Sequence, residues 1–229
     1  MTTSTALEYH DLPALMTRMT GDEKHTASAT STLDVLWVLY DRILRVDPAN
    51  EADPDRDRFL LSKGHGPVAY YAVLAAKGFI PVGMLDDFAG YRSPLGHHPD
   101  RTLIPGVEIG SGSLGHGLPI AVGQAVALGI KGSQGRVICL VGDAELDEGS
   151  NHEAIAFAAR YALSGLTVVV VDNDSASHGW PGGIAERFAV EGWATETVDG
   201  RDHDTIEAAL LSPHEDRPLA VVARVVEKR

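Results

Sequence analysis

The sequence is poor in cysteine and in positive charge. The first shortage excludes a disulfide within the chain, and the second argues against nucleic-acid binding. Its single cysteine, Cys139, cannot form a disulfide within the chain. It lies in the apolar run Val137 to Val141, where we expect it to pack as a small core side chain. Lysine and arginine number 19 against 32 aspartate and glutamate, a formal net charge of -13 at pH 7. Because no basic cluster offsets this charge, the surface should repel phosphate backbones, which argues against nucleic-acid binding.

Long apolar runs are missing as well. No stretch has the length of a membrane-spanning helix, and the first residues do not follow the signal-peptide pattern. We therefore expect a cytoplasmic protein that does not bind membranes. Hydrophobic residues nevertheless make up 44% of the chain, which is enough to bury the core of one large α/β domain over residues 1–229.

Short runs rich in valine, isoleucine and leucine alternate with stretches of helical periodicity. Strands are predicted at Arg58–Leu61, Val137–Val141, Leu166–Val171, Ala194–Val198 and Leu219–Val226. Helices are predicted at 12–19, 31–46, 67–76, 118–130, 151–163, 183–191 and 204–211, the second one stopped by Asp47 and Pro48. Continuous apolar strands between helices are typical of a parallel sheet covered on both faces, so we expect a three-layer α/β domain.

Residues 90–118 are rich in glycine, proline and histidine, and a loop this long in a compact domain is usually functional. The stretch Gly110 to Gly117 contains the pattern G-x-G-x-x-G. A dinucleotide site would also need a preceding strand and an acidic residue about 20 residues further on, and no Asp or Glu lies between His116 and Gly142. The alternatives are a flexible turn, or a loop whose backbone approaches an anionic ligand at the start of the next helix.

Polar residues follow two of the predicted strands. Asp143 comes after the run that ends at Val141, and Asn173 comes after the run that ends at Val171. Because the carboxyl ends of parallel strands share one edge of a sheet, the two side chains can meet there. A carboxylate and an amide oxygen suit Mg²⁺, which also binds phosphate oxygens. The alternative is that Asp143 caps the following helix and Asn173 lies in a turn.

The segment Gly142 to Gly149, read with Asp172-Asn173, resembles the thiamine-diphosphate motif of the transketolase family. Four other segments resemble family motifs in the same order, and they are 25–48, Ser62–Gly66, Gly96–Asp100 and 105–118. The resemblance covers nearly the whole chain. It implies the thiamine-diphosphate-binding fold and, in function, the N-terminal, diphosphate-binding subunit of a split transketolase.

The resemblance also implies a site for thiamine diphosphate and magnesium. The metal ligands would be Asp143, Asn173 and the backbone carbonyl of Ser175. The cofactor-binding residues would be Gly112, Ser113, Leu114, Gly142, Asp143, Ala144, Asn173 and His178. Ala144 replaces a glycine that is usual in the family, and its methyl group is tolerated if the backbone there is right-handed.

Three histidines fall on family positions, His25, His65 and His98, and the resemblance implies that they face the reactive thiazolium and the sugar hydroxyls. Imidazole suits such proton transfers at neutral pH. His97 competes with His98 for its role, and the proline that follows favours His98. Glu148 matches a family glutamate that relays protons between two active sites. Its alternative is an ordinary acidic residue at a helix start.

The activity implied is ketol transfer between sugars or sugar phosphates. In the family a second domain binds the aminopyrimidine of the cofactor, and we expect a C-terminal transketolase-like partner subunit to carry it, with two copies of each chain. Two alternatives stay open, a thiamine-diphosphate enzyme of the 2-oxoacid decarboxylating type and a degenerate, non-catalytic partner subunit.

Overall fold

The computed structural model describes residues 7–20 and 26–225, without the side chains of residues 26–29. Its centre is a five-stranded sheet in the order β1-β2-β3-β5-β4, in which every neighbouring pair is parallel. The strands are β1 (Arg58–Leu61), β2 (Val137–Gly142), β3 (Leu166–Asp172), β4 (Ala194–Asp199) and β5 (Leu219–Arg224). All five predicted strands are therefore confirmed, with small shifts at their carboxyl ends.

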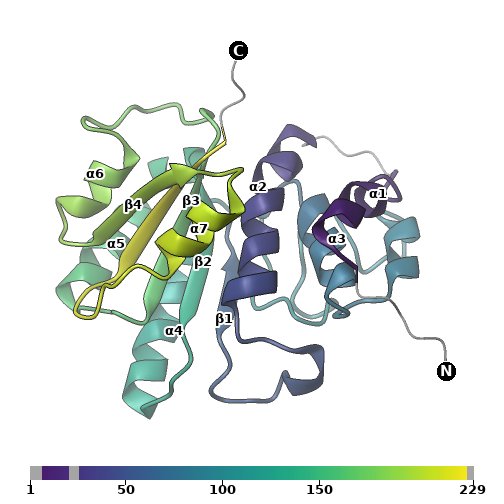
Figure 1. The fold of residues 1–229 in the computed structure, drawn as a ribbon, viewed down its shortest axis with the longest axis horizontal. Coiled ribbons are helices and arrows are strands. Elements are labelled where there is room, and N and C mark those ends of the chain that lie inside the picture. Colours follow the sequence, from purple (N-terminus) through teal and green to yellow (C-terminus); the bar gives the residue numbers. More distant parts are fainter. Residues whose placement is uncertain (1–6, 21–25, 226–229) are drawn as a thin grey trace.

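Helices cover both faces of the sheet (Figure 1). The helices on one face are α1 (Leu12–Met16), α2 (Thr26–Val38), α3 (Val68–Ala76) and α7 (His203–Leu210), and those on the other are α4 (Gly117–Lys131), α5 (Gly149–Arg160) and α6 (Ile184–Ala189). Successive strand residues point to opposite faces, so Ile138 and Leu140 join the first core while Val137, Cys139 and Val141 join the second. The three-layer α/β prediction is confirmed, as is the burial of Cys139. None of the helices in the described ranges has the length and apolar character needed to cross a bilayer.

The helix predicted at 31–46 is wrong at both ends, and it begins earlier than predicted, at Thr26. The helix expected to run to Val46 stops as α2 at Val38, and a π-helical turn, η2 (Leu39–Ile43), follows it. The Leu44 N–H bonds to the Leu39 carbonyl at 2.8 Å, and Leu44 itself is extended. Asp47 instead accepts a hydrogen bond from the Ala49 N–H at 2.7 Å, at the start of the 3-10 turn η3 (Pro48–Asn50).

Three further 3-10 turns were not predicted, η1 (Tyr9–Asp11), η4 (Val82–Asp87) and η5 (Ala144–Asp147). Between η4 and α4 the described chain forms neither helix nor strand, as the composition of residues 90–118 predicts.

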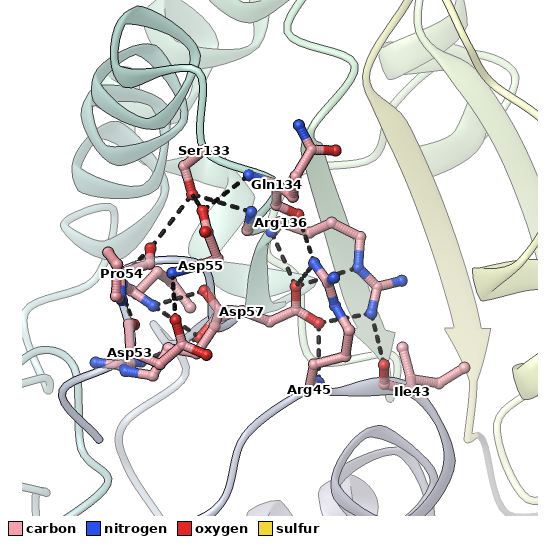
Figure 2. Close-up of polar contacts among 12 residues, drawn as sticks. Ile43, Arg45, Asp53, Pro54, Asp55, Asp57, Ser133, Gln134 and Arg136 are labelled. Atoms are coloured by element: carbon pink, nitrogen blue, oxygen red, sulfur yellow. Dashed lines mark hydrogen bonds and ion pairs between the residues drawn. The ribbon is translucent and has the colours of Figure 1, made fainter. Parts of the chain in front are cut away.

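A buried carboxylate, that of Asp57, ties together the amino ends of β1 and β2 (Figure 2). It accepts hydrogen bonds from the backbone N–H groups of Arg45 and Arg136, both at 2.9 Å, and from their guanidinium groups at 3.0 and 2.6 Å. Burial alone would raise the pKa of Asp57, but the hydrogen bonds from Arg136 and Arg45 outweigh it and lower the pKa. Nearby, the exposed Asp55 accepts from the Ser133 hydroxyl at 2.7 Å.

We predict that Asp57→Asn lowers the free energy of unfolding by about 3 kcal/mol, because the amide cannot accept all these bonds and turns its own N–H groups toward two arginines. Urea denaturation at pH 7 measures the loss. The contribution of Asp57 should be present above its unfolded pKa, near 3.9, and disappear as pH falls through the lowered folded-state pKa. The matched change Asp55→Asn, in the same network but exposed, should cost about 1 kcal/mol or less. Equal losses in the two variants would contradict this role for Asp57.

Candidate functional site

The carboxyl ends of β1, β2 and β3 lead into three of the segments that carry the predicted site residues. Ser62 follows β1, Asp143 follows β2 and Asn173 follows β3. Because these strands are parallel neighbours, the three segments emerge at the same edge of the sheet. The site is therefore positioned by the registry of the sheet, although its residues lie far apart in the sequence.

Asp143, Asn173 and Ser175 are brought into direct contact. The Asp143 carboxylate is 2% exposed, and its Oδ2 accepts hydrogen bonds from the N–H groups of Ser175 at 2.6 Å and Ala176 at 3.1 Å. The Ser175 Oγ lies 2.6 Å from Asp143 Oδ1 and 2.7 Å from Asn173 Oδ1. The helix that begins near Asp147 is α5, whose N-cap is Glu148, and Asp143 makes no side-chain capping bond to η5 either, so the alternative that Asp143 serves as a helix cap is wrong.

These oxygens fit a divalent cation. The Ser175 hydroxyl has one proton and can donate it to only one of the two oxygens it contacts, which leaves an oxygen-rich group short of protons. Carboxylate, amide and carbonyl oxygens are the ligands that Mg²⁺ takes in proteins. No group of three or more His, Cys, Asp or Glu side chains in the described residues could hold a metal. Water or phosphate oxygens would therefore have to complete the coordination here.

The methyl group of Ala144 needs no strained backbone. The non-glycine residues with positive φ in the described chain are Ala89, Ala162 and Asp174, so Ala144, in the turn η5, is not among them. The methyl group that replaces the family's glycine is therefore accommodated on a right-handed backbone, as expected.

The buried carboxylate of Glu145 joins three loops of the site, a role that the sequence analysis missed. Glu145 is 1% exposed and accepts hydrogen bonds from the Ser62 hydroxyl, from the Gly115 N–H at 3.0 Å and from the Gly142 N–H at 3.3 Å. Ser62 Oγ in turn accepts from the Gly117 N–H at 3.0 Å. Burial raises the pKa of Glu145 despite these hydrogen bonds. The end of β1, the glycine-rich loop and the end of β2 therefore share one anchor.

Lys63 is the second residue that the sequence analysis gave no role. It is buried against Gly142, where an added Cβ would lie 3.2 Å from the lysine Cδ, and its Nζ lies 3.4 Å from Ser31 Oγ. Burial lowers the pKa of Lys63 to about 8, although Asp143 and Glu145 act in the opposite direction. A signal was available, because Lys63 comes just after a buried strand and directly before Gly64 and His65 of the same motif.

The glycine-rich loop packs against His98. Gly112 has φ 123°, and a Cβ there would lie 2.5 Å from the His98 ring. The ring of His97 packs instead against Phe88, with centroids 5.6 Å apart. His98 thus lies at the loop and His97 away from it, and the role of His98 stays a prediction. Within this loop Ser111 Oγ is buried and lacks a hydrogen-bond partner, as expected of a loop that approaches a ligand.

The other predicted residues are distributed around these loops. Ser113, Leu114, Glu148 and His178 are exposed, and His65 is half-buried. A Cβ on Gly115 would lie 2.6 Å from the Glu148 Cβ, so Glu148 borders the glycine-rich loop. The His178 N–H donates to Asp147 Oδ2 at 3.2 Å. His25 lies outside the described residues.

The dinucleotide alternative is wrong. Across the described stretch from η4 to α4 no strand precedes Gly110. The combination of strand, glycine turn and helix that binds a pyrophosphate in such folds is therefore missing here.

Comparisons with a family model, with curated proteins and with solved structures point to the same family. The family model described as transketolase, thiamine diphosphate binding domain, matches residues 18–226. "Ferredoxin fas2" of Rhodococcoides fascians is 60% identical over 225 residues, which are 98% of this chain and 74% of that protein.

Two other relatives have names that specify subunits of a transketolase. An apulose-4-phosphate transketolase subunit of Actinobacillus succinogenes is 44% identical over 145 residues, 63% of this chain and 52% of that protein. The 6-deoxy-6-sulfo-D-fructose transketolase subunit SqwG of a Clostridium species is 34% identical over 192 residues, 81% of this chain and 70% of that protein.

Among solved structures, transketolase from Leishmania mexicana superposes with a TM-score of 0.78 at 23% identity, over 96% of this chain and 37% of that one. Transketolase from Campylobacter jejuni gives 0.76 at 22% identity, over 95% and 38%. At this identity the likeness shows the fold. The chain spans little more than a third of these solved transketolases.

We predict that burial of Lys63 makes stability depend on pH. Its pKa is about 8 in the folded chain against an ordinary value of 10.5, so between these values the unfolded chain binds more protons and stability rises with pH. Relative to Lys63→Met, the wild type should gain about 3 kcal/mol between pH 7.5 and 10.5 in urea denaturation without metal or cofactor. Lys131→Met, a change at an exposed helix end, is the control and should show no such trend. A flat difference for Lys63→Met would contradict the prediction.

Proposed function

This chain belongs to the transketolase family, as a thiamine diphosphate binding domain, and from this premise we propose that residues 1–229 form one diphosphate-binding subunit of a split transketolase. The observation that carries the proposal is the contact among Asp143, Asn173 and Ser175 at the carboxyl edge of the sheet. The names of the Actinobacillus and Clostridium relatives, which specify transketolase subunits, support the split organisation. The proposal includes the cytoplasmic location expected from the sequence.

In this proposal Asp143, Asn173 and the Ser175 carbonyl hold Mg²⁺, and the cofactor diphosphate completes its coordination. Bound thiamine diphosphate supplies the electron sink that carbon–carbon bond cleavage needs. The remaining residues proposed to contact it are Gly112, Ser113, Leu114, Gly142, Ala144 and His178. Glu145 holds the cofactor-binding loops in place, because its carboxylate accepts hydrogen bonds from the Gly115 and Gly142 N–H groups.

We assign proton transfer to the histidines. His98 packs on Gly112, and His65 follows β1 at the same edge of the sheet as Asp143. Imidazole groups so placed can donate a proton to a sugar alkoxide and accept one from a hydroxyl at neutral pH. His25 is proposed for the same task. Glu148, exposed beside the glycine-rich loop, is proposed as a relay to a second active site across a subunit interface.

The partner in this proposal is a C-terminal transketolase-like subunit that binds the aminopyrimidine, with two copies of each chain in the assembly. The substrates are sugars or sugar phosphates. The names of the transketolase relatives favour ketol transfer over 2-oxoacid decarboxylation, and the negative φ of Ala144 removes one argument for a degenerate subunit.

We predict that Asp143→Asn weakens Mg²⁺-dependent binding of thiamine diphosphate by more than about 100-fold, because a charged metal ligand is lost. Asparagine is preferable to alanine because alanine would also release the Ser175 and Ala176 N–H groups. Calorimetric titration with the partner chain present measures the affinity. Asp216→Asn makes the same charge change at an exposed residue in the loop before β5, outside the proposed site, and should bind as wild type does. Unchanged affinity in Asp143→Asn would refute the metal assignment.

We predict that the purified chain alone has no ketol transferase activity and that activity appears on adding the partner chain. A ketose donor and a 2-oxoacid are assayed in parallel, and native mass spectrometry gives the copy number of each chain.

His65→Ala and His98→Ala should assemble and bind cofactor normally but slow turnover by roughly 10²–10⁴-fold.

Three results would count against the split-transketolase assignment. Strong ketol transfer by this chain alone would remove the need for a partner. Turnover of the 2-oxoacid alone would assign the decarboxylating class. A complex that forms, binds cofactor and turns over neither substrate would favour the non-catalytic alternative.

A further inference from the structure

A pocket lies beside the Asp143 loop, on the side that faces α6. Its volume is about 210 Å³, and its polar lining includes Asp147, His152, His178 and Arg187, with Trp180 at its side. It is formed by η5, the start of α5, the loop that follows Asn173, and α6. The proposed function assigns no role to Arg187 or Trp180.

Arg187 is the unusual residue of this pocket. The side chain is only 6% exposed, and both Nε and Nη2 are buried without a hydrogen-bond partner. The Trp180 ring covers the guanidinium, with Cζ 5.1 Å from the ring centroid. Burial lowers the pKa of Arg187, but an arginine remains charged in proteins. A buried positive charge without a partner destabilises the fold unless an anion completes the site.

The two unsatisfied atoms define the shape of the missing partner. Nε and Nη2 form one edge of the guanidinium, and their N–H groups point the same way, as a fork that matches the two oxygens of a carboxylate or phosphate. A single carbonyl or hydroxyl oxygen could satisfy only half of this fork. This buried edge of Arg187, a residue that lines the pocket, therefore has two N–H donors that no acceptor satisfies among the described residues.

The acidic residues of the pocket do not fill this position. Asp147 Oδ2 accepts from the N–H groups of Ser177 and His178, both at 3.2 Å. Both Asp143 oxygens accept from Ser175, and one of them also accepts from Ala176. Among the described residues, no acidic side chain forms an ion pair with Arg187. Both oxygens of Asp143 and one oxygen of Asp147 are therefore bonded to the loop that builds the pocket wall, and Asp147 acts on Arg187 through its charge without an ion-pair contact.

We propose that this pocket is an oxyanion-binding site, in which a carboxylate or phosphate group binds side-on to Nε and Nη2 of Arg187 beneath the Trp180 ring. The oxyanion has two possible sources, a free anion or the diphosphate of the cofactor, since Asp143 and Ala176 also line the pocket. The site does not depend on the proposed transketolase activity, because the fork is unsatisfied in the chain itself.

The test is an anion titration of the chain without cofactor or metal. Inorganic phosphate and acetate are titrated at constant ionic strength against chloride, and the melting temperature is followed. We expect saturable stabilisation of the wild type and at least a tenfold weaker effect in Arg187→Met. In chloride alone Arg187→Met should be at least as stable as wild type, because an unpaired buried charge is replaced by an apolar side chain. Arg217→Met, an exposed change in the loop before β5, should titrate as wild type does.

A second variant keeps the test decisive if Arg187→Met does not fold. Arg187→Lys retains the charge but not the fork, and should also weaken phosphate or acetate binding at least tenfold. No saturable effect of either anion on wild type, or equal titrations in wild type and the Arg187 variants, would overturn the site.

The source of the oxyanion is assigned by adding thiamine diphosphate and Mg²⁺ to the complex of this chain with its partner chain. Displacement of inorganic phosphate, together with weaker cofactor binding in Arg187→Met, assigns the site to the cofactor diphosphate. Unchanged phosphate affinity assigns it to a separate anion, with a preference for acetate over phosphate indicating a carboxylate. Failure of the cofactor to bind at all would count against the proposed function and leave the phosphate titration intact.

Discussion

The geometry of the whole site depends on one buried carboxylate, that of Glu145. Its two oxygens hold the Ser62 hydroxyl and the N–H groups of Gly115 and Gly142, so it links the ends of β1 and β2 to the glycine-rich loop. A buried carboxylate is unfavourable unless hydrogen bonds satisfy it, and a buried donor that loses its acceptor is costly as well. The loops can therefore hardly move apart without leaving both the acceptor and its donors unsatisfied.

Burial and neighbouring charges together set the pKa values of the ionisable groups near Glu145. Lys63 lies beside Gly142 with Asp143 and Glu145 in its field, and burial lowers the lysine pKa while it raises that of Glu145. Both shifts favour the neutral forms, as expected where polar groups are removed from water. Lys63 and Glu145 thus lie at the carboxyl edge of the sheet in an environment where a bound anion or cation would strongly change their protonation.

The two ends of the sheet have different tasks. At the amino end, Asp57 accepts hydrogen bonds from Arg45 and Arg136, an arrangement that stabilises the loops and leaves none of its buried side-chain atoms without a partner. At the carboxyl end, polar atoms of Ser111 and Arg187 are buried and unpaired. Buried polar atoms without partners destabilise the fold. They lie at the carboxyl edge of the sheet, where a ligand is expected.

The sequence by itself determined the five strands and the meeting of Asp143 with Asn173, because continuous apolar runs must be buried and parallel strands end at one edge. Tertiary structure alone decided the early end of α2, where Leu44 turns back to Leu39. It also decided the importance of Glu145 and Arg187. In the sequence each reads as an ordinary charged residue, because burial and the absence of a partner are properties of three-dimensional packing, which local periodicity does not encode.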